Sequence, residues 1–152
     1  MGYSVEEFWA ESCGVTGVGP DEPYQVWYFG NESDQAQTLA KLVLSGKKIA
    51  TASLVETNLL EPEKAPIDGG YSVITSFEGE PICVVRTTEI RNLPFSDVDV
   101  DFAFDEGEDD QTLESWREGH WAYFSRESAE LGFHFDGNSI VCCERFTLLY
   151  PR

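Results

Sequence analysis

The hydrophobic period of the chain changes at Gly46, and this change limits the fold more than any other feature of the sequence. Before it, Leu39, Leu42 and Val43 fall on one face of a helix, and Gly46 is a natural helix stop. After it, residues 49–55 have the composition of a strand. A helix followed directly by a strand predicts an α+β fold.

The rest of the chain supplies further elements of both kinds. No internal repeat or linker divides its 152 residues, a usual length for one compact domain. We therefore expect one α+β domain with helices packed around a curled antiparallel sheet. The expected elements are a helix over 4–12 that opens with a Ser4/Glu7 capping box, a long connection over 13–31, a helix from Ser33, a strand over 49–55, a turn-rich loop over 61–70, a hairpin of strands 71–77 and 82–90, an acidic loop over 96–111, a helix over 112–131 with a break near Gly119, and a strand over 139–150.

The charge balance narrows the choice of partner. Ten Lys and Arg residues stand against 28 Asp and Glu residues, which gives a formal net charge of −18. Binding of duplex DNA or long RNA through phosphates requires a basic face. We therefore expect no DNA partner, whereas a single nucleoside, which carries little charge, escapes this objection.

The cysteines and the N-terminus indicate a reducing compartment. The sequence shows no signal peptide and no apolar run of membrane-spanning length, and none of its cysteines is spaced C-x-x-C. We expect a cytoplasmic protein without disulfides, metal or cofactor, and with no membrane partner. The oligomeric state stays open. The four cysteines are Cys13, Cys83, Cys142 and Cys143.

Lys48 and Thr51 lie at the corner where the helix gives way to the strand. Lysines there have a structural use, because cations favour the negative end of a helix dipole. In a fully extended segment residues three apart point to opposite faces, so the amine and the hydroxyl converge only if Lys48 belongs to the turn. A buried amine whose pKa is lowered from about 10.4 can then activate a hydroxyl.

The acidic segment 102–110 also has two interpretations. Most charge runs are solvated loops. Here Phe102 and Phe104 alternate into the run, so part of it is expected to pack on the core. A carboxylate held beside apolar surface has a raised pKa and can act as a general acid or base. The regular spacing of a calcium loop is absent.

Arg86 and His120 are two further polar residues in apolar surroundings. Arg86 lies in the middle of a strand and needs a carboxylate, Glu144 or Glu89, or else a bound nucleoside or phosphate. His120 has no acidic or cysteine partner at metal-ligand spacing. We interpret His120 as a hydrogen-bonded packing residue.

Four segments, in collinear order from about residue 27 to residue 146, resemble motifs of the ASCH family of small, RNA-associated β-barrel proteins. A Gly-x-Lys-x-x-Thr corner alone would be a weak signal, but four motifs in sequence are specific for the family. The segments are the corner 42–53; the strand and loop 86–90 with Pro94, Phe95 and Val98; the acidic loop and helix 102–109 with Leu113, Trp116, His120, Trp121, Tyr123 and Phe124; and the last strand 143–146. The last two are similar to the longer bacterial branch of the family.

The resemblance implies a PUA-like fold, a small antiparallel β-barrel with flanking helices, over residues 27–152. Residues 1–26 would be a helical extension and loop packed on that domain. The resemblance also implies a function related to RNA. Some short relatives are amidohydrolases that remove the acyl group from N4-acetylcytidine with a lysine, a threonine and a glutamate; others are reported as ribonucleases. A ribonuclease ranks lower here, because the sequence shows no histidine pair or metal site.

The resemblance assigns catalytic roles to Lys48, Thr51 and Glu106. Thr51 would attack the amide carbonyl, Lys48 would take its proton as a neutral amine, and Glu106 would protonate the leaving cytosine amine. Asp105 or Glu108 can align in place of Glu106. The residues implied to bind or stack the base are Arg86, Trp27 and Trp116.

A binding module without catalysis is the alternative function. Such a module would bind a nucleotide, a short RNA or a protein partner in the same cleft, next to the Gly-x-Lys corner. RNA binding predicts a compact positive patch formed by Lys41, Lys47, Lys48 and Arg86. Catalysis predicts instead that Lys48, Thr51 and Glu106 meet around one cavity.

Overall fold

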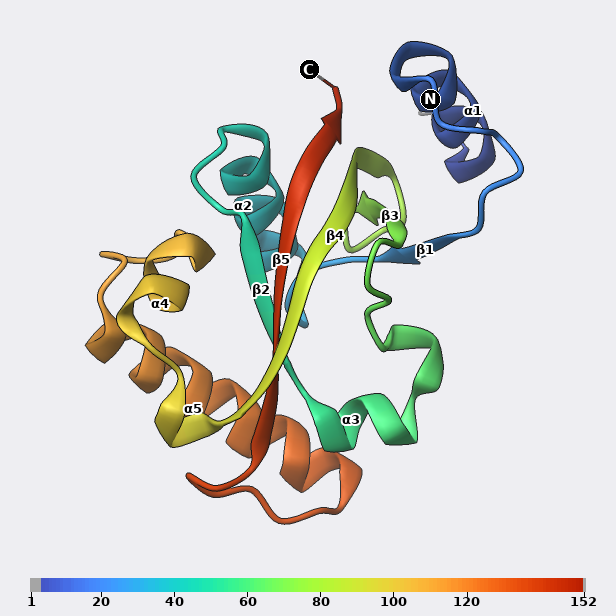
Figure 1. Cartoon of the computed structure of the whole chain (residues 1–152). Helices are drawn as coiled ribbons and strands as arrows, with labels where there is room; N and C mark the ends of the chain where they lie inside the picture. Colours follow the sequence, from blue (N-terminus) through green and yellow to red (C-terminus); the bar gives the residue numbers. More distant parts are fainter. Residues whose placement is uncertain (1–3, 152) are drawn as a thin grey trace.

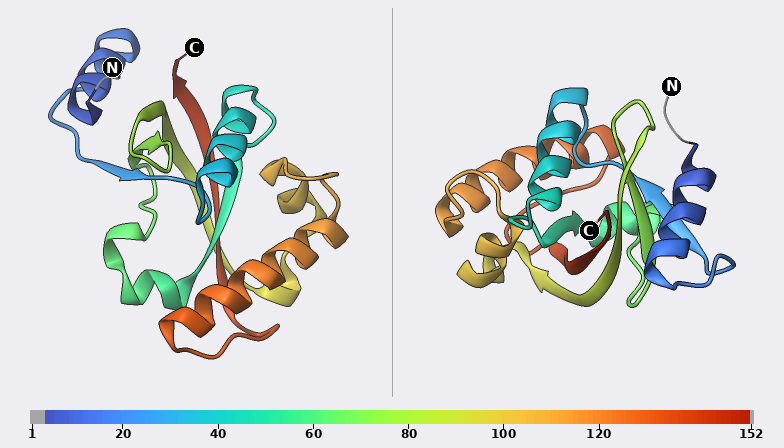
Figure 2. Two further views of the ribbon diagram at one scale, coloured as in Figure 1. Left: turned by 180° about the vertical axis from the view of Figure 1, so that it is seen from behind. Right: turned by 90° about the horizontal axis from the view of Figure 1, so that it is seen from above.

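A curved five-stranded sheet with helices on both of its faces organises the chain (Figure 1 and Figure 2). The computed structural model describes residues 4–151. The strand order is β1-β3-β4-β5-β2. The elements are α1 (Val5–Thr16), β1 (Tyr24–Trp27), α2 (Ser33–Leu44), β2 (Ala50–Leu54), α3 (Val55–Leu60), η1 (Pro62–Lys64), β3 (Tyr71–Thr75), β4 (Pro81–Pro94), η2 (Phe95–Asp97), α4 (Val100–Glu106), α5 (Leu113–Leu131) and β5 (Ile140–Tyr150).

The α+β, PUA-like fold class is confirmed. The pairs β3–β4, β4–β5 and β5–β2 are antiparallel, while β1 joins β3 in parallel. Within residues 4–151 the strand order ends at β1 and β2 without a ladder between them, so the sheet is curled but not closed into a barrel. None of the helices in this range is long and apolar enough to cross a membrane.

Three apolar clusters hold the helices on the sheet. One lies under α1 and contains Phe8, Trp9 and Val84; another lies under α2. The third joins α4 and α5 to β2 and β5 through residues such as Phe102 and Phe124. All four cysteines are free and buried, and burial raises the pKa of the Cys83 thiol to about 12.

The two helices predicted before Gly46 are present. Ser4 and Glu7 form the expected capping box, and α1 continues one turn beyond the predicted end because it stops only at Gly17, where φ is 82°. The second helix starts at Ser33 as predicted.

The prediction of a loop over 96–111 is wrong for its central part, which forms α4. Asp99 caps this helix by accepting a hydrogen bond from the backbone N–H of Phe102. Phe102 and Ala103 are buried, so the helix packs on the core although it carries several carboxylates. The helix α5 runs through Gly119 without the expected break, and α3 was not predicted.

Candidate functional site

A pocket of about 490 Å³ lies where α2, β2, α4 and α5 meet. Thr51 of β2 lines it, together with Trp116, His120 and Tyr123 of α5. The lining also contains Phe29 and several carboxylates. Those carboxylates are Glu32, Asp34, Glu106, Glu108 and Asp109.

The corner before β2 is fixed to the end of α4 by backbone contacts. The Ile49 N–H donates to the Asp105 carbonyl at 2.8 Å. Gly107 ends α4 with φ 69°, and a Cβ added there would lie 2.3 Å from the Lys47 carbonyl oxygen. Only glycine allows this approach, which brings Lys48 against the C-terminal end of α4.

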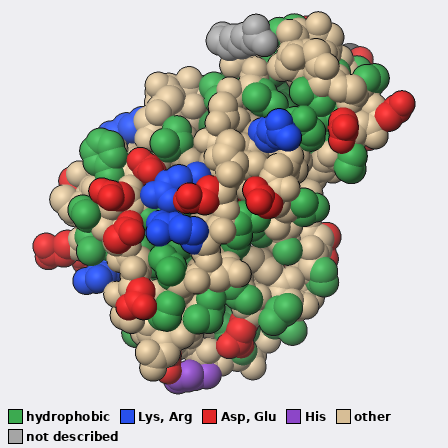
Figure 3. All heavy atoms as spheres, viewed as in Figure 1, with side chains coloured by type: hydrophobic (Ala, Val, Ile, Leu, Met, Phe, Trp, Pro, Cys, Tyr) green, Lys and Arg blue, Asp and Glu red, His purple; other side chains and the backbone are tan. Residues whose placement is uncertain are grey.

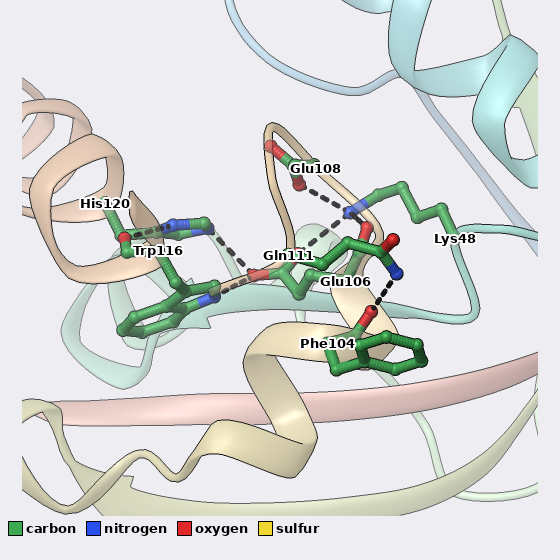
Figure 4. Close-up of polar contacts among 7 residues, drawn as sticks. All are labelled: Lys48, Phe104, Glu106, Glu108, Gln111, Trp116 and His120. Atoms are coloured by element: carbon green, nitrogen blue, oxygen red, sulfur yellow. Dashed lines mark hydrogen bonds and ion pairs between the residues drawn. The ribbon is translucent and has the colours of Figure 1, made fainter. Parts of the chain in front are cut away.

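Lys48 is a buried ammonium held by two glutamates, as Figure 4 shows. Its Nζ lies 2.8 Å from Glu106 Oε1 and 2.6 Å from Glu108 Oε2, and 3.3 Å from the Glu106 carbonyl oxygen. The Phe29 ring centroid is 5.3 Å away. All three protons of the ammonium therefore have acceptors within the protein.

Glu106 is the centre of the network and is only 1% exposed. One carboxylate oxygen accepts from Lys48. The other accepts from the Trp116 indole N–H and from His120 Nε2, the latter at 2.8 Å. Figure 4 shows these donors converging on the carboxylate from the corner and from α5.

The two ring nitrogens of His120 both face acceptors. Nε2 meets the Glu106 carboxylate, and Nδ1 lies 2.9 Å from the Trp116 carbonyl oxygen. A neutral imidazole has one N–H and satisfies only one of them, whereas the imidazolium satisfies both. Burial lowers the pKa of His120, but the Glu106 carboxylate outweighs it and the net pKa is raised.

The pKa shifts correct the role expected for Lys48. Burial lowers the pKa of Lys48, yet Glu106 and Glu108 more than offset this, so its pKa lies above the ordinary value and the amine is charged at rest. Burial raises the pKa of Glu106, but Lys48 and His120 overcome it and the net pKa is low. The pKa of Glu108 is raised, by burial and by the charge of Glu106. Lys48 is therefore no neutral base, and the raised pKa of Glu108 makes it easier to protonate than Glu106, whose pKa is lowered.

Glu106, Glu108 and His120 also bring three metal-ligand atoms within 4.8 Å of one another. Lys48 already supplies the positive charge between the two carboxylates. A divalent cation would have to displace the ammonium and a proton of His120. The donor set therefore suits its own lysine better than a metal.

The loop that carries Glu108 is held in an uncommon conformation. Asp109 and Gln111 have φ values of 51° and 63°, which non-glycine residues seldom adopt. The Gln111 side-chain amide donates to the Phe104 carbonyl at 3.0 Å and closes the loop (Figure 4). Such strained positions cluster at functional sites.

The structure brings together part of the predicted site. Lys48 and Trp116 both donate hydrogen bonds to Glu106, and Thr51 lines the pocket that Glu106 and Trp116 also line. Trp27 instead packs edge-to-face on Phe29, with 4.9 Å between the ring centroids, and it does not belong to the residues that line the pocket, whereas Phe29 does.

Arg86 lies on the other face of the sheet, which corrects its expected partners. Its Nε donates to the Gly69 carbonyl, and its guanidinium lies 5.2 Å from the Tyr71 ring centroid. Glu144 and Glu89, the carboxylates expected to pair with it, bind Thr87 and Arg145 instead. The four cations proposed to form an RNA-binding patch are thus not assembled, because Lys48 is buried and Arg86 faces α1.

Sequence reasoning named Glu108 only as an alternative to Glu106, and it interpreted His120 as a packing residue without a functional role. The signal for His120 was its spacing: it follows Trp116 by four residues, so both side chains share one helix face. Their rings stack with 4.2 Å between centroids and 13° between planes. The partner of His120 was hidden, because Glu106 comes from another helix.

Comparison with known proteins matches the ASCH domain over residues 25–150. The chain belongs to the ASCH family. The crystal structure of an ASCH domain from Lactobacillus crispatus JV V101 is 30% identical, has a TM-score of 0.85, and covers 96% of this chain and 94% of that one. A protein from Enterococcus faecalis V583 is 32% identical with a TM-score of 0.84 over 95% of this chain and 86% of that one.

A more distant likeness bears on the fold alone. The crystal structure of a hypothetical protein is 12% identical, with a TM-score of 0.55 over 82% of this chain and 97% of that chain. No curated protein matches the chain by sequence. The pocket is therefore the main indication of the function of this ASCH protein.

Proposed function

We propose that this ASCH protein is an amidohydrolase that deacylates a modified nucleoside such as N4-acetylcytidine. The family is generally linked to RNA-related work. The observation that carries the proposal is that Thr51 opens onto the pocket beside the buried Lys48–Glu106 pair. The pocket volume, about 490 Å³, lies within the range of roughly 300–1,000 Å³ that small-molecule sites have.

In the proposed reaction Thr51 is the nucleophile. Its Oγ1 forms a bond to the acyl carbon, the C–N bond breaks, and the cytidine amine leaves with a proton. Water then hydrolyses the threonine ester. Glu108 is the proton donor to the amine in this proposal, because it lines the pocket and burial and the Glu106 charge raise its pKa.

Lys48 and Glu106 serve this reaction as a fixed charge pair. The ammonium favours negative charge that develops near it on the acyl oxygen, in surroundings with little water. Glu106 holds Lys48, Trp116 and His120 in place.

Deacetylation of N4-acetylcytidine, followed by chromatography, tests the proposal. Wild-type protein is expected to turn the nucleoside over, and Thr51→Val and Lys48→Met are expected to lose about a hundredfold or more. Lys47→Met is the matched control, because Lys47 is the exposed neighbour of Lys48 and should change little. Melting curves for each variant separate loss of chemistry from loss of the fold.

A binding module without catalysis is the second candidate. It is favoured by the three internal acceptors of the Lys48 ammonium, which leave the amine no role as a base. Nucleoside binding without turnover in the wild-type protein would decide for this candidate. Turnover that survives Thr51→Val would instead keep the enzyme and reject the nucleophile.

A further inference from the structure

Glu144 is a buried acidic residue that neither the network around Glu106 nor the proposed reaction uses. It lies in β5 and is 6% exposed. Its side chain accepts a hydrogen bond from the Thr87 hydroxyl, which donates to Oε2 at 2.6 Å. Within residues 4–151 no lysine, arginine or histidine forms an ion pair with it at 4 Å or less. A buried carboxylate without a cation is costly, because its charge is removed from water without a compensating ion pair.

The strand register places Glu144 directly opposite Thr51. The two residues are Cα partners in the antiparallel β2–β5 ladder. Side chains of directly opposite residues stand on the same face of the sheet, with Cβ atoms roughly 4.5–5.5 Å apart. Thr51 lines the pocket and is partly buried, whereas Glu144 is buried.

The other polar groups near Thr51 are poorly suited to accept its proton. Lys48 is an ammonium whose protons are all donated, and His120 faces acceptors with both nitrogens. Glu106 already accepts three donors. Glu108 is the proposed proton donor. Glu144 is the remaining candidate for the proton acceptor. Thr87 donates a hydrogen bond to it, and such a bond favours the unprotonated carboxylate that a proton acceptor must be.

We propose that Glu144 orients the Thr51 hydroxyl and receives its proton when Oγ1 attacks the acyl carbon, an inference that rests on the amidohydrolase proposal. In this step the O–H bond breaks, the C–O bond forms, and the carbonyl electron pair moves onto the acyl oxygen. When the C–N bond breaks, the leaving amine takes its proton from Glu108. Water then attacks the ester carbon and gives one proton to the Glu108 carboxylate. The bond between the acyl carbon and Oγ1 breaks, Glu144 returns its proton to Thr51, and the carboxylic acid is released. Because Glu144 exchanges a proton with the reacting Oγ1, it is a catalytic residue in this proposal.

The surroundings of Glu144 agree with this role. Burial raises the pKa of Glu144, and Thr87 and the Lys48 charge offset this only in part. The facing titratable and charged groups that bear on it are Lys48 from the corner and its strand neighbour Cys142, whose thiol pKa the Glu144 charge helps to raise. A carboxylate with a raised pKa is a better proton acceptor than an exposed one.

A test that does not depend on the nucleoside is acetylation of Thr51 by 4-nitrophenyl acetate, located and timed by peptide mass spectrometry. Wild-type protein is expected to be acetylated at Thr51. Glu144→Gln keeps the shape and the acceptor for Thr87, and is expected to slow acetylation by about a hundredfold. Glu144→Asp is expected to restore part of the rate, and it serves as the second variant if the glutamine form does not fold. Glu130→Gln, an exposed glutamate of α5, is the control and should match the wild type.

The outcomes separate this inference from the proposed function. Wild-type rates in folded Glu144→Gln, or no acetylation of Thr51 in the wild type, would overturn the role of Glu144. Glu144-dependent acetylation without turnover of N4-acetylcytidine would keep the inference and reject that substrate. Turnover of the nucleoside that falls in kcat with an unchanged KM in Glu144→Gln supports both.

Discussion

At the residue scale the site is organised by the burial of Lys48. An uncompensated ammonium in the interior is strongly unfavourable, and removing one partner of such a buried pair costs about 3–5 kcal/mol. Glu106 and Glu108 compensate it, and Glu106 is in turn shared with Trp116 and His120. The side chains therefore form one unit, in which each charge depends on the others.

His120 reports on that unit through its pKa. Its imidazolium stabilises the fold below the ordinary pKa of 6.5, and this contribution is lost as pH rises through the raised pKa of the folded state. We expect the His120 ring, followed by NMR, to titrate with a midpoint above 6.5. Glu106→Gln should lower the midpoint, because the carboxylate is the cause of the shift, while Glu130→Gln should leave it unchanged. A wild-type midpoint at or below the ordinary value would show that His120 is neutral and that the network is held differently.

At the scale of elements, prediction succeeded where the signal was local. The helix from Ser33 follows from its apolar stripe, and the capping box at Ser4 follows from two residues three apart. The helix α4 was missed because its surface carboxylates dominate the composition of residues 96–111, whereas burial of Phe102 depends on α5 and the sheet. The contact of Lys48 with Glu106 joins residues 58 apart in sequence, which no periodicity reveals.

The junction of α4 with the corner before β2 makes a sharp test of this arrangement. Gly107→Ala places a Cβ 2.3 Å from the Lys47 carbonyl oxygen at a positive φ, so we expect destabilisation of more than about 1 kcal/mol in urea unfolding. Gly119→Ala is the matched control within α5, where an added Cβ meets nothing within 4 Å. It should stabilise the protein by about 0.5–1 kcal/mol. Equal changes in the free energy of unfolding for the two substitutions would mean that the corner before β2 does not lie in close contact with the end of α4.

At the scale of the whole molecule, acidic charge surrounds the few cations. Arg91 lies within 4 Å of Glu89 and Asp99, and Arg145 within 4 Å of Glu89 and Asp105. Figure 3 shows Lys and Arg side chains gathered on one face with acidic side chains between and around them. With a net charge of −18, phosphates gain little from approaching such a surface.

The pocket is also lined by carboxylates, and their negative charge should favour a ligand without a phosphate. Glu32, Asp34 and Asp109 line it beside the network of Glu106. We expect cytidine to bind more tightly than cytidine 5′-monophosphate by about tenfold at low salt, measured by calorimetry, with the difference shrinking as salt screens the carboxylates. Reversing two charges, Glu32→Lys with Asp34→Lys, should remove the preference while cytidine still binds. Equal affinity for the two ligands in the wild type would place the phosphate away from these carboxylates, and a nucleotide or the end of an RNA strand would then fit the pocket as well as a free nucleoside does.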